Sequence, residues 1–305
     1  MKISYVIVIN TFQRPMFLVE RALRSILRQD ILPEKVILLD QNNDGFLDLA
    51  DDLKSNSIFE QIVCNKISVS KARNMILKHN ISQDWIVFCD DDGYFADNYS
   101  LIFAAILKND PQIEVISGSI LRDDNYEFYT KRHQIGGSLK KFANQKLLMG
   151  SNFAVRTKVF IKLNGFDENF GAGAFYGSSE ETDFAWKVYY DSRRAEFFKE
   201  LQVIHVRPYN SNLQQSLSKA WRYGFGKGAL VSKWLMKGKY QVFFEAIEMT
   251  IVPLLKVIFS LFSLNIKNIL INLVVLISRY VGLLAFPAFF VFEKFQHRQE
   301  IKIST

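Results

Sequence analysis

Apolar runs and helical spacings alternate along the first two thirds of the chain. Residues 3–9 form a β-branched apolar run, which predicts a buried strand. Apolar side chains recur at helical spacing in residues 16–29, and residues 35–40 form the next apolar run. Strand, helix and strand in this order predict a βαβ unit. Such a unit implies a parallel sheet that binds its ligands at the carboxyl ends of the strands.

The same alternation continues towards residue 206. It predicts helices at 70–80 and 98–108 and strands at 84–90, 113–119, 147–156 and 202–206. A Gly-rich stretch precedes a helix that we expect to start near Ser178 or Ser179. Residues 122–146 are polar and irregular, and we expect a long loop at the active site there. The predicted fold class is α/β, with a mostly parallel central sheet flanked by helices.

The last third of the chain has a different composition. It is helical and basic from about residue 214 and strongly apolar from 242. Residues 207–305 hold 13 lysines and arginines against 4 acidic residues, a net charge of +9. The rest holds 25 against 27, a net charge of −2. We therefore expect two domains, an α/β domain at 1–210 and a helical, membrane-associating region at 211–305.

The apolar part of this region is long enough to meet a bilayer. Residues 268–292 match the length of a span, and 249–264 form a shorter apolar segment. Arg279 interrupts the longer segment and would need a partner or a route to the interface. Basic residues flank both ends of the pair, which favours a hairpin, re-entrant or in-plane anchor at the cytoplasmic face. A helical pair packed on the enzyme body is the alternative. The three glycines of "RYGFGKG" predict a bend in the preceding helix.

Several classes of protein fit the sequence poorly. The first ten residues resemble a buried strand rather than a signal peptide, because no small-residue cleavage site follows them. Cys64 and Cys89 are too few for a disulfide framework or a zinc cluster, which suits a reducing compartment. The basic residues adjoin apolar runs, which argues against nucleic acid as a partner. The chain also has no GxxxxGK[ST] segment.

Three consecutive carboxylates, Asp90, Asp91 and Asp92, follow the strand predicted at 84–90. They suit a solvated turn, a metal site or an enclosed acid/base pair. Full solvation is difficult directly after a buried strand, whereas a Mg²⁺ or Mn²⁺ ion with a diphosphate would offset the repulsion. We therefore expect a metal–diphosphate site, with Arg14, Lys71 and Arg73 around it.

A second acidic cluster, "SSEETDF", contains Glu180, Glu181 and Asp183. Acidic residues at a helix start are favourable without any function, since they cap the helix and interact with its dipole. The alternative is a general base that takes a proton from an acceptor hydroxyl. The upstream Gly-rich loop could close over a ligand. His205, at the end of the last predicted strand, is either structural or a ligand.

Taken together, these segments resemble the family-2 glycosyltransferases of the GT-A fold. The matching stretches, in order, are "VIVINTFQRP", "VILLDQNNDG", "SKARNMIL", "IVFCDDDGYF", "GSNFAVRTKVFIKLNGFDENFG", "SSEETDF" and "VIHV". They cover about residues 3–206. The resemblance implies transfer of a sugar, with inversion, from a nucleoside-diphosphate sugar to an acceptor hydroxyl.

The resemblance also implies a role for each matching residue. Donor binding is implied for Thr11, Arg14, Asp40, Arg73, Asp90 and Asp91, with Asn74 as support, and binding of Mn²⁺ or Mg²⁺ for Asp92 and His205. Glu181 matches the general base, and Glu180 and Asp183 would orient the acceptor. Two positions depart from the family pattern. Gln13 replaces an asparagine, and Glu181 replaces an aspartate, so the base could instead be Glu180 or Asp183.

The anchor and the resemblance together suggest a partner. We expect a membrane-associated enzyme acting on a glycan or lipid-linked acceptor in bacterial polysaccharide or cell-envelope synthesis. Two alternatives remain at this point. One is an enzyme that makes a polyprenyl-phosphate sugar, and the other is a non-catalytic membrane scaffold that keeps the fold.

Overall fold

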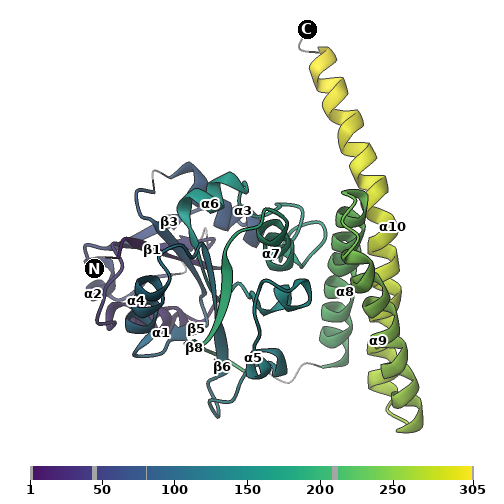
Figure 1. The fold of residues 1–305 in the computed structure, drawn as a ribbon, viewed down its shortest axis with the longest axis horizontal. Helices are drawn as coiled ribbons and strands as arrows, with labels where there is room; N and C mark the ends of the chain where they lie inside the picture. The colour runs from purple at the N-terminus through teal and green to yellow at the C-terminus, as the bar shows by residue number, and fades with distance from the viewer. Residues whose placement is uncertain (1–2, 43–46, 80, 208–211, 304–305) are drawn as a thin grey trace. The chain divides into compact units, whose positions relative to one another are not determined.

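The computed structural model describes residues 3–42, 47–79, 81–207 and 212–303. The chain folds into two units (Figure 1). The first comprises Met1–Glu168 and Glu180–Pro208, and the second comprises Asn169–Ser179 and Tyr209–Thr305. A short segment in the middle of the chain thus belongs to the C-terminal unit.

The first unit is built on one sheet in the order β3-β2-β1-β4-β7-β6-β8-β5. Strands β1, β2, β3 and β4 run parallel to one another, and β6 runs parallel to β8. Strand β7 is antiparallel to both β4 and β6, and β5 is antiparallel to β8. The strands are β1 Tyr5–Thr11, β2 Lys35–Asp40, β3 Phe59–Val63, β4 Trp85–Asp90, β5 Gly93–Phe95, β6 Val115–Arg122, β7 Asn152–Arg156 and β8 Ala195–His205.

Alternate residues of the central strands enter two separate cores. Ile7 and Ile9 of β1 pack with α1 and α4, whereas Val6 and Val8 pack with α3, α6 and α7 on the other face. Because both faces are buried, these strands are continuous apolar runs, as in other parallel sheets. The helices are α1 Met16–Leu27, α2 Asp51–Lys54, α3 Val69–Asn74, α4 Tyr99–Asn109, α5 Lys131–Ile135, α6 Thr157–Lys162 and α7 Glu180–Tyr190, with 3-10 turns at Met75–Lys78 and Phe142–Leu147.

The predicted α/β class with a mostly parallel sheet is confirmed, and the main differences lie at its edges. Strands β3 and β5 were not predicted. The region 122–146 is not wholly irregular, since it contains α5 and a 3-10 turn. Strand β8 is longer than the predicted strand, because it begins at Ala195 and pairs with both β6 and β5.

The second unit contains three long helices, α8 Leu213–Met236, α9 Val242–Phe262 and α10 Ile266–Ile303. Segment Asn169–Ser179 packs its rings among them: Tyr176 lies 5.6 Å from Phe225 of α8 and 5.7 Å from Phe286 of α10 between ring centroids. The Gly-rich loop therefore has its aromatic contacts within the helical unit.

The bend predicted at "RYGFGKG" was wrong, because α8 is continuous through it. A Cβ atom at Gly228 would collide with the carbonyl oxygen of Arg279, and one at Gly282 with that of Phe225. A Cβ at Gly224 would collide with Ser278. The glycines thus allow the backbones of α8 and α10 to approach closely, as small residues do between helices.

The segment Ile266–Val291 of α10 is long and apolar enough to cross a membrane, with a mean hydropathy of 2.2. Arg279 lies within it and donates from Nη1 to the carbonyl oxygen of Met249 in α9, at 2.6 Å. This carbonyl would normally accept from the residue four positions later, but that residue is Pro253, which has no N–H. The proline therefore leaves an acceptor that the arginine uses.

Candidate active site

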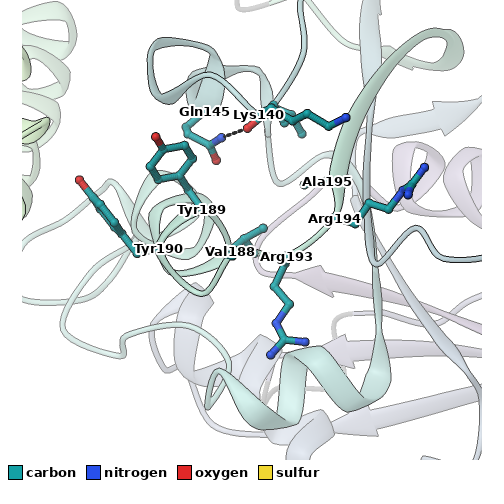
Figure 2. A pocket seen from close by; sticks show the side chains of 10 residues that line it. Lys140, Gln145, Val188, Tyr189, Tyr190, Arg193, Arg194 and Ala195 are labelled. Atoms are coloured by element: carbon teal, nitrogen blue, oxygen red, sulfur yellow. Dashed lines mark hydrogen bonds between the residues drawn. The ribbon is translucent and has the colours of Figure 1, made fainter.

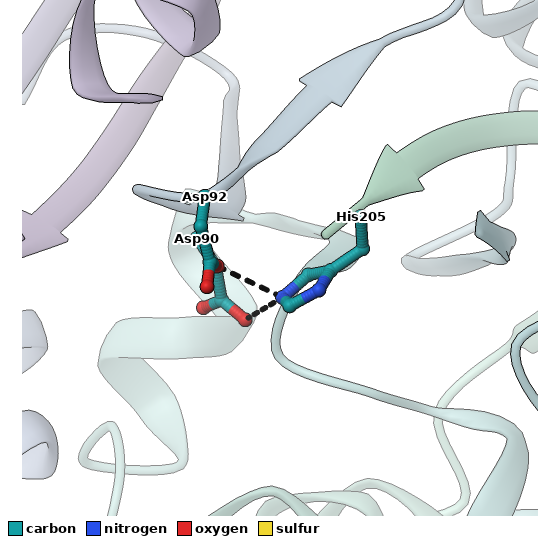
Figure 3. A group of neighbouring side chains, drawn as sticks. All are labelled: Asp90, Asp92 and His205. Carbon is teal, nitrogen blue, oxygen red and sulfur yellow. Dashed lines mark ion pairs between the residues drawn. The ribbon is translucent and has the colours of Figure 1, made fainter. Parts of the chain in front are cut away.

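Two aspartates and a histidine converge at the carboxyl ends of β4 and β8 (Figure 3). Nε2 of His205 lies 2.9 Å from Oδ1 of Asp92 and 3.6 Å from Oδ2 of Asp90. The potential ligand atoms of the three residues all lie within 4.8 Å of one another. Strand pairing brings them together, since β5 continues from Asp92 and places Gly93 opposite His205.

The carboxylates of this group are faced by cations. Arg14, in the loop after β1, donates from Nε to Asp91 at 2.9 Å and lies 3.0 Å from Asp92. Burial raises the pKa of Asp91 to about 6, although Arg14 lowers it. Burial also acts on Asp90, but His205 and Arg73 outweigh it and hold its pKa below the ordinary value.

His205 faces two aspartates that favour its protonated form. Burial lowers its pKa, but the hydrogen bonds and charges of Asp90 and Asp92 outweigh this effect and raise it to about 10. Its Nδ1 donates to the carbonyl oxygen of Val206 at 2.9 Å, which leaves Nε2 directed at the two aspartates. A histidine that ligates a metal must be neutral, so a cation here would take the place of this proton.

Arg73 connects the aspartates to the second acidic cluster. It lies on α3 and is buried, and its Nη2 donates to Asp90 at 2.9 Å. Its Nη1 lies 3.7 Å from Oε1 of Glu181 and has no hydrogen-bond partner in the described part of the chain. Asn74 fixes this helix, since it donates to the carbonyl oxygen of Phe166 and accepts from the N–H of the same residue.

Glu180, Glu181 and Asp183 all lie in the first turn of α7. Asp183 is fully buried, whereas 30% of the Glu181 side chain is exposed. Burial and the charge of Glu180 raise the pKa of Glu181 to about 8, against the opposing effect of Arg73. Burial also raises the pKa of Glu180. Glu180 and Glu181 are both partly exposed, and Glu181 has a pKa of about 8, close to neutral.

Asp40 and Thr11 lie at the same edge of the sheet. They are paired across β1 and β2, and both are buried. Oδ1 of Asp40 accepts from the side chain of Asn42 at 2.7 Å, and Oδ2 accepts from Gln61 at 2.8 Å. The structure thus gathers Thr11, Arg14, Asp40, Arg73 and the three aspartates around the ends of β1, β2 and β4. Lys71, by contrast, is exposed on α3.

Sequence reasoning missed two residues that shape this site. A Cβ at Gly150 would collide with the carboxylate of Glu181 and lie within 2.7 Å of Arg73, so only glycine leaves room for this pair. Tyr129, in the region 122–146, packs edge-on against His205 with 5.4 Å between ring centroids. The glycine in "LLMGSN" was a feature of the sequence that could have indicated a close approach at this position. Nothing in the sequence around Tyr129 indicated its contact with His205.

A pocket of about 520 Å³ lies at the opposite end of β8, where that strand begins (Figure 2). Tyr189 and Tyr190 line it. Its arginines are already paired: Arg193 with Asp191 and Glu114, and Arg194 with Asp110. This pocket holds no part of the group at Asp90.

The donor atoms at Asp90, Asp92 and His205 fit a divalent cation. Two carboxylate oxygens and one imidazole nitrogen converge on one small region and leave further positions for other ligands. Oxygen ligands suit Mg²⁺ and Mn²⁺, and the nitrogen is better matched to a transition metal such as Mn²⁺.

The chain is similar to known glycosyltransferases. The model of the family described as glycosyl transferase family 2 matches residues 6–166. Over 160 residues the chain is 28% identical to the O-antigen chain rhamnosyltransferase RfbN of Salmonella typhimurium, a match that covers 48% of this chain and 51% of that protein. The chain thus matches about half the length of this curated relative.

Two solved structures share the fold. One is the mannosyltransferase PcManGT from Pyrobaculum calidifontis in complex with GDP-Man and Mn²⁺, with a TM-score of 0.57 and 15% identity over 93% of this chain and 88% of that one. The other is TarS of S. aureus, with a TM-score of 0.54 and 16% identity over 72% of this chain and 39% of that one. These similarities confirm the predicted GT-A fold.

Proposed function

The chain belongs to glycosyl transferase family 2, and from this we propose that it transfers a sugar from a nucleoside-diphosphate sugar to an acceptor hydroxyl with inversion. The support is the arrangement around Arg73, which contacts Asp90 and lies close to Glu181. One buried cation thereby joins the predicted donor site to the predicted base. The family match covers residues 6–166, and the roles proposed for Glu181 and His205 rest on the resemblance of their segments and on this geometry.

Asp90, Asp92 and His205 would hold a divalent cation, Mn²⁺ or Mg²⁺, with the diphosphate of the donor. Such an ion, when bound, neutralises charge on the diphosphate and makes it a better leaving group. The mannosyltransferase from Pyrobaculum forms a complex with GDP-Man and Mn²⁺, which supports the same class of cation and donor here. Asp40, with its two amide partners, and Thr11 would bind the nucleoside.

Two arginines would assist departure of the diphosphate. Arg14 and Arg73 each lie within 3.0 Å of an aspartate in the cluster, so their positions are fixed before the donor binds. Fixed cations stabilise charge that develops in the transition state without reorganisation. We assign them to the diphosphate oxygens as the bond between the anomeric carbon and the phosphate oxygen breaks.

Glu181 would be the general base. Its carboxylate takes the proton of the acceptor hydroxyl while the hydroxyl oxygen attacks the anomeric carbon from the face opposite the diphosphate. A pKa of about 8 is close to the optimum for this role, because the base is then both available and strong near neutral pH. Glu180, on the same turn, would orient the acceptor, and buried Asp183 would hold the turn in place.

The acceptor we propose is a glycan or lipid-linked glycan at the cytoplasmic face of the membrane, in polysaccharide synthesis. The relative RfbN is named for O-antigen, which is a polysaccharide. Ile266–Val291 has the length and hydropathy of a span, and large apolar side chains are exposed at the turn from α9 to α10, including Phe262, Leu264 and Ile266. We assign residues 1–210 to catalysis and 211–305 to membrane association.

Donor binding tests this proposal. The full chain in detergent would be titrated with UDP-, GDP- and dTDP-sugars, with Mn²⁺ or with EDTA, while its thermal stability is followed. We expect one nucleotide to raise the melting temperature in Mn²⁺ only. Asp92→Asn should abolish that shift.

The matched control is Asp84→Asn. Asp84 is an exposed aspartate just before β4, at the end of the strand opposite Asp92. The Asp84→Asn variant should show the same rise in melting temperature with the nucleotide as the wild type. If no donor stabilises folded protein, the enzymatic proposal fails and a non-catalytic scaffold becomes the better explanation.

A further inference from the structure

A pocket of about 410 Å³ lies between α1 and β5, the edge strand that follows Asp92 directly. Its α1 side is formed by one face of the helix, where Phe17, Arg21, Arg24 and Arg28 recur at helical spacing. Tyr94 of β5 lines the other side. This pocket therefore begins within two residues of the aspartate predicted to hold the cation.

Arg14 lies in the loop before α1, and Arg21 and Arg28 lie on α1 or directly after it, two helical turns apart. Arg14 bonds to Asp91 at the candidate active site, and Arg21 and Arg28 follow at spacings of seven residues. Arg24 is held by Asp52 in a two-pronged ion pair of 2.5 and 3.1 Å, so it contributes less free charge. Arg28 is exposed and has no ion pair among the described residues.

Arg21 has hydrogen-bonding capacity that the described residues do not use. Its guanidinium stacks over the ring of Tyr94 at 4.4 Å and lies 3.7 Å from Asp123. Its Nε and Nη2 are buried and donate to no atom in the described ranges. The exposed part of the side chain, 34% of its surface, lines the pocket, and an oxyanion there would form a charge-assisted contact with it.

The rim of the pocket is apolar on one side. Phe17, which lines the pocket at the start of α1, is 65% exposed. The pocket also contains Glu20 and Asp97, but Glu20 already accepts from the N–H of Ala50, and Asp97 is exposed. Guanidinium groups beside exposed apolar side chains match an amphiphile that carries phosphate on an apolar chain.

We propose that this pocket binds the diphosphate of a lipid-linked acceptor, with Arg21 and Arg28 on the phosphates and Phe17 against the lipid chain. The two arginines are separated by about 10 Å along the helix, enough to flank one diphosphate. This inference rests on the proposed function, since it concerns the acceptor of that same reaction. Asp123 connects this pocket to the candidate active site, because its side chain lies near Arg21 and its N–H donates to the carbonyl oxygen of His205 at 3.1 Å.

Binding of farnesyl diphosphate to the full chain in detergent tests the proposal. EDTA is present throughout, so the cation site cannot hold a diphosphate through a metal. We expect the double variant Arg21→Gln/Arg28→Gln to bind at least tenfold more weakly than the wild type. The control Lys108→Gln/Lys158→Gln removes the same charge from exposed positions on α4 and α6 and should bind within twofold of the wild type.

Three comparison ligands define the chemistry. Farnesol should not compete, inorganic pyrophosphate should compete weakly, and phosphatidylglycerol micelles should not displace farnesyl diphosphate. Equal affinity for pyrophosphate, displacement by phosphatidylglycerol, or unchanged binding in the arginine variant would each overturn the proposal.

Nucleotide binding is measured on separate portions of the same proteins, in Mn²⁺ and without EDTA. It reports that the arginine variant is folded, and it should equal that of the wild type. If the wild type binds no nucleotide, the proposed function fails. If nucleotide binds normally but the affinity for farnesyl diphosphate is unchanged in the arginine variant, only the proposal of the acceptor pocket is wrong.

Discussion

The two units of the chain bury charged groups in different ways. In the α/β unit, Asp90, Asp91 and Asp92 face Arg14, Arg73 and His205 within a few ångströms. In the described part of the helical unit, two partly or fully buried cations have contacts with another helix. Lys227 pairs with Glu245 at 2.5 Å, and Arg279 donates to the carbonyl oxygen of Met249.

We interpret this difference as one between charge proposed for chemistry and charge that stabilises packing. In the α/β unit the groups perturb one another, so the pKa of Glu181 rises to about 8 and that of His205 to about 10. Perturbed pairs of titratable groups mark functional sites. In the helical unit Lys227 pairs with Glu245 and Arg279 with the Met249 carbonyl, contacts that link one helix to another.

The largest effect that would test this distinction is the loss of Glu181. Glu181→Gln removes the proton acceptor but keeps the shape of the side chain, so we expect the turnover rate to fall by about 10²–10⁴-fold. Donor binding in Mn²⁺ should stay within twofold, because Glu181 is not among the predicted donor ligands. Turnover is measured by release of the nucleoside diphosphate.

Glu180→Gln is the matched control on the same helical turn, and it should reduce turnover far less. If Glu180→Gln is the inactive variant, the base is Glu180. If neither variant loses activity, the acceptor needs no base, and transfer to a lipid phosphate becomes the better interpretation.

The next effect concerns packing in the helical unit. Arg279→Leu leaves the Met249 carbonyl without its donor, and we expect a loss of about 1–3 kcal/mol in stability. Pro253→Ala restores a backbone N–H four residues after Met249. The double variant Arg279→Leu/Pro253→Ala should therefore recover most of that loss. Thermal unfolding in detergent measures all three proteins.

This pair has an internal control. Pro287 is the other proline of the apolar segments. Pro287→Ala also introduces a backbone N–H into a helix, but that N–H is not four residues after Met249. It should not rescue Arg279→Leu. Equal rescue by both proline substitutions would mean that helix propensity, rather than the Met249 carbonyl, is responsible.

The central fold was predictable because its strands are buried on both faces. The runs of β1, β2 and β4 needed no partner to be visible in the sequence. Strand β5 could not be predicted, since it is three residues long and forms only by pairing with β8, about 110 residues later. The glycines of α8 misled the prediction because their helical conformation depends on close packing with α10.

The candidate site was predictable where it depends on strand ends. The rule for carboxyl ends predicted that Asp40 and Asp90 lie at one edge, and the register confirms it, with Thr11 beside Asp40 and Asn10 beside Asp90. The contact of Arg73 with Glu181 could not be predicted, since it joins α3 to α7 across the space left by Gly150. A contact among three segments that are far apart in the sequence leaves no pattern in the spacing of neighbouring residues.

A smaller effect is the pH dependence of the reaction. The base must be deprotonated, so a pKa of about 8 predicts activity that rises about tenfold per pH unit up to that value and then levels off. The ratio kcat/KM measured from pH 5.5 to 9.5 at saturating Mn²⁺ checks this. A rise already complete below pH 6 would mean that Glu181 is an ordinary surface carboxylate and that the contrast with the helical unit is weaker than proposed.

The smallest effect is one of stability, and it has the opposite sign to the effect on activity. Glu181 has a higher pKa in the folded protein than the ordinary glutamate value of 4.5, so between pH 4.5 and about 8 the folded state binds more protons than the unfolded state. Stability from this group is therefore lost as the pH rises through that window.

Glutamine does not titrate, so the melting temperature of Glu181→Gln should equal that of the wild type near pH 4.5 and exceed it near pH 8. We expect about 3 °C, equivalent to about 1 kcal/mol, after allowing for solvent screening of the exposed part of the side chain. Glu200→Gln, an exposed glutamate on β8, is the control and should show no such trend. A difference in melting temperature that is independent of pH would mean that ionisation of Glu181 does not destabilise the folded protein. Glu181 would then not be a group whose charge is unfavourable to folding and kept for chemistry.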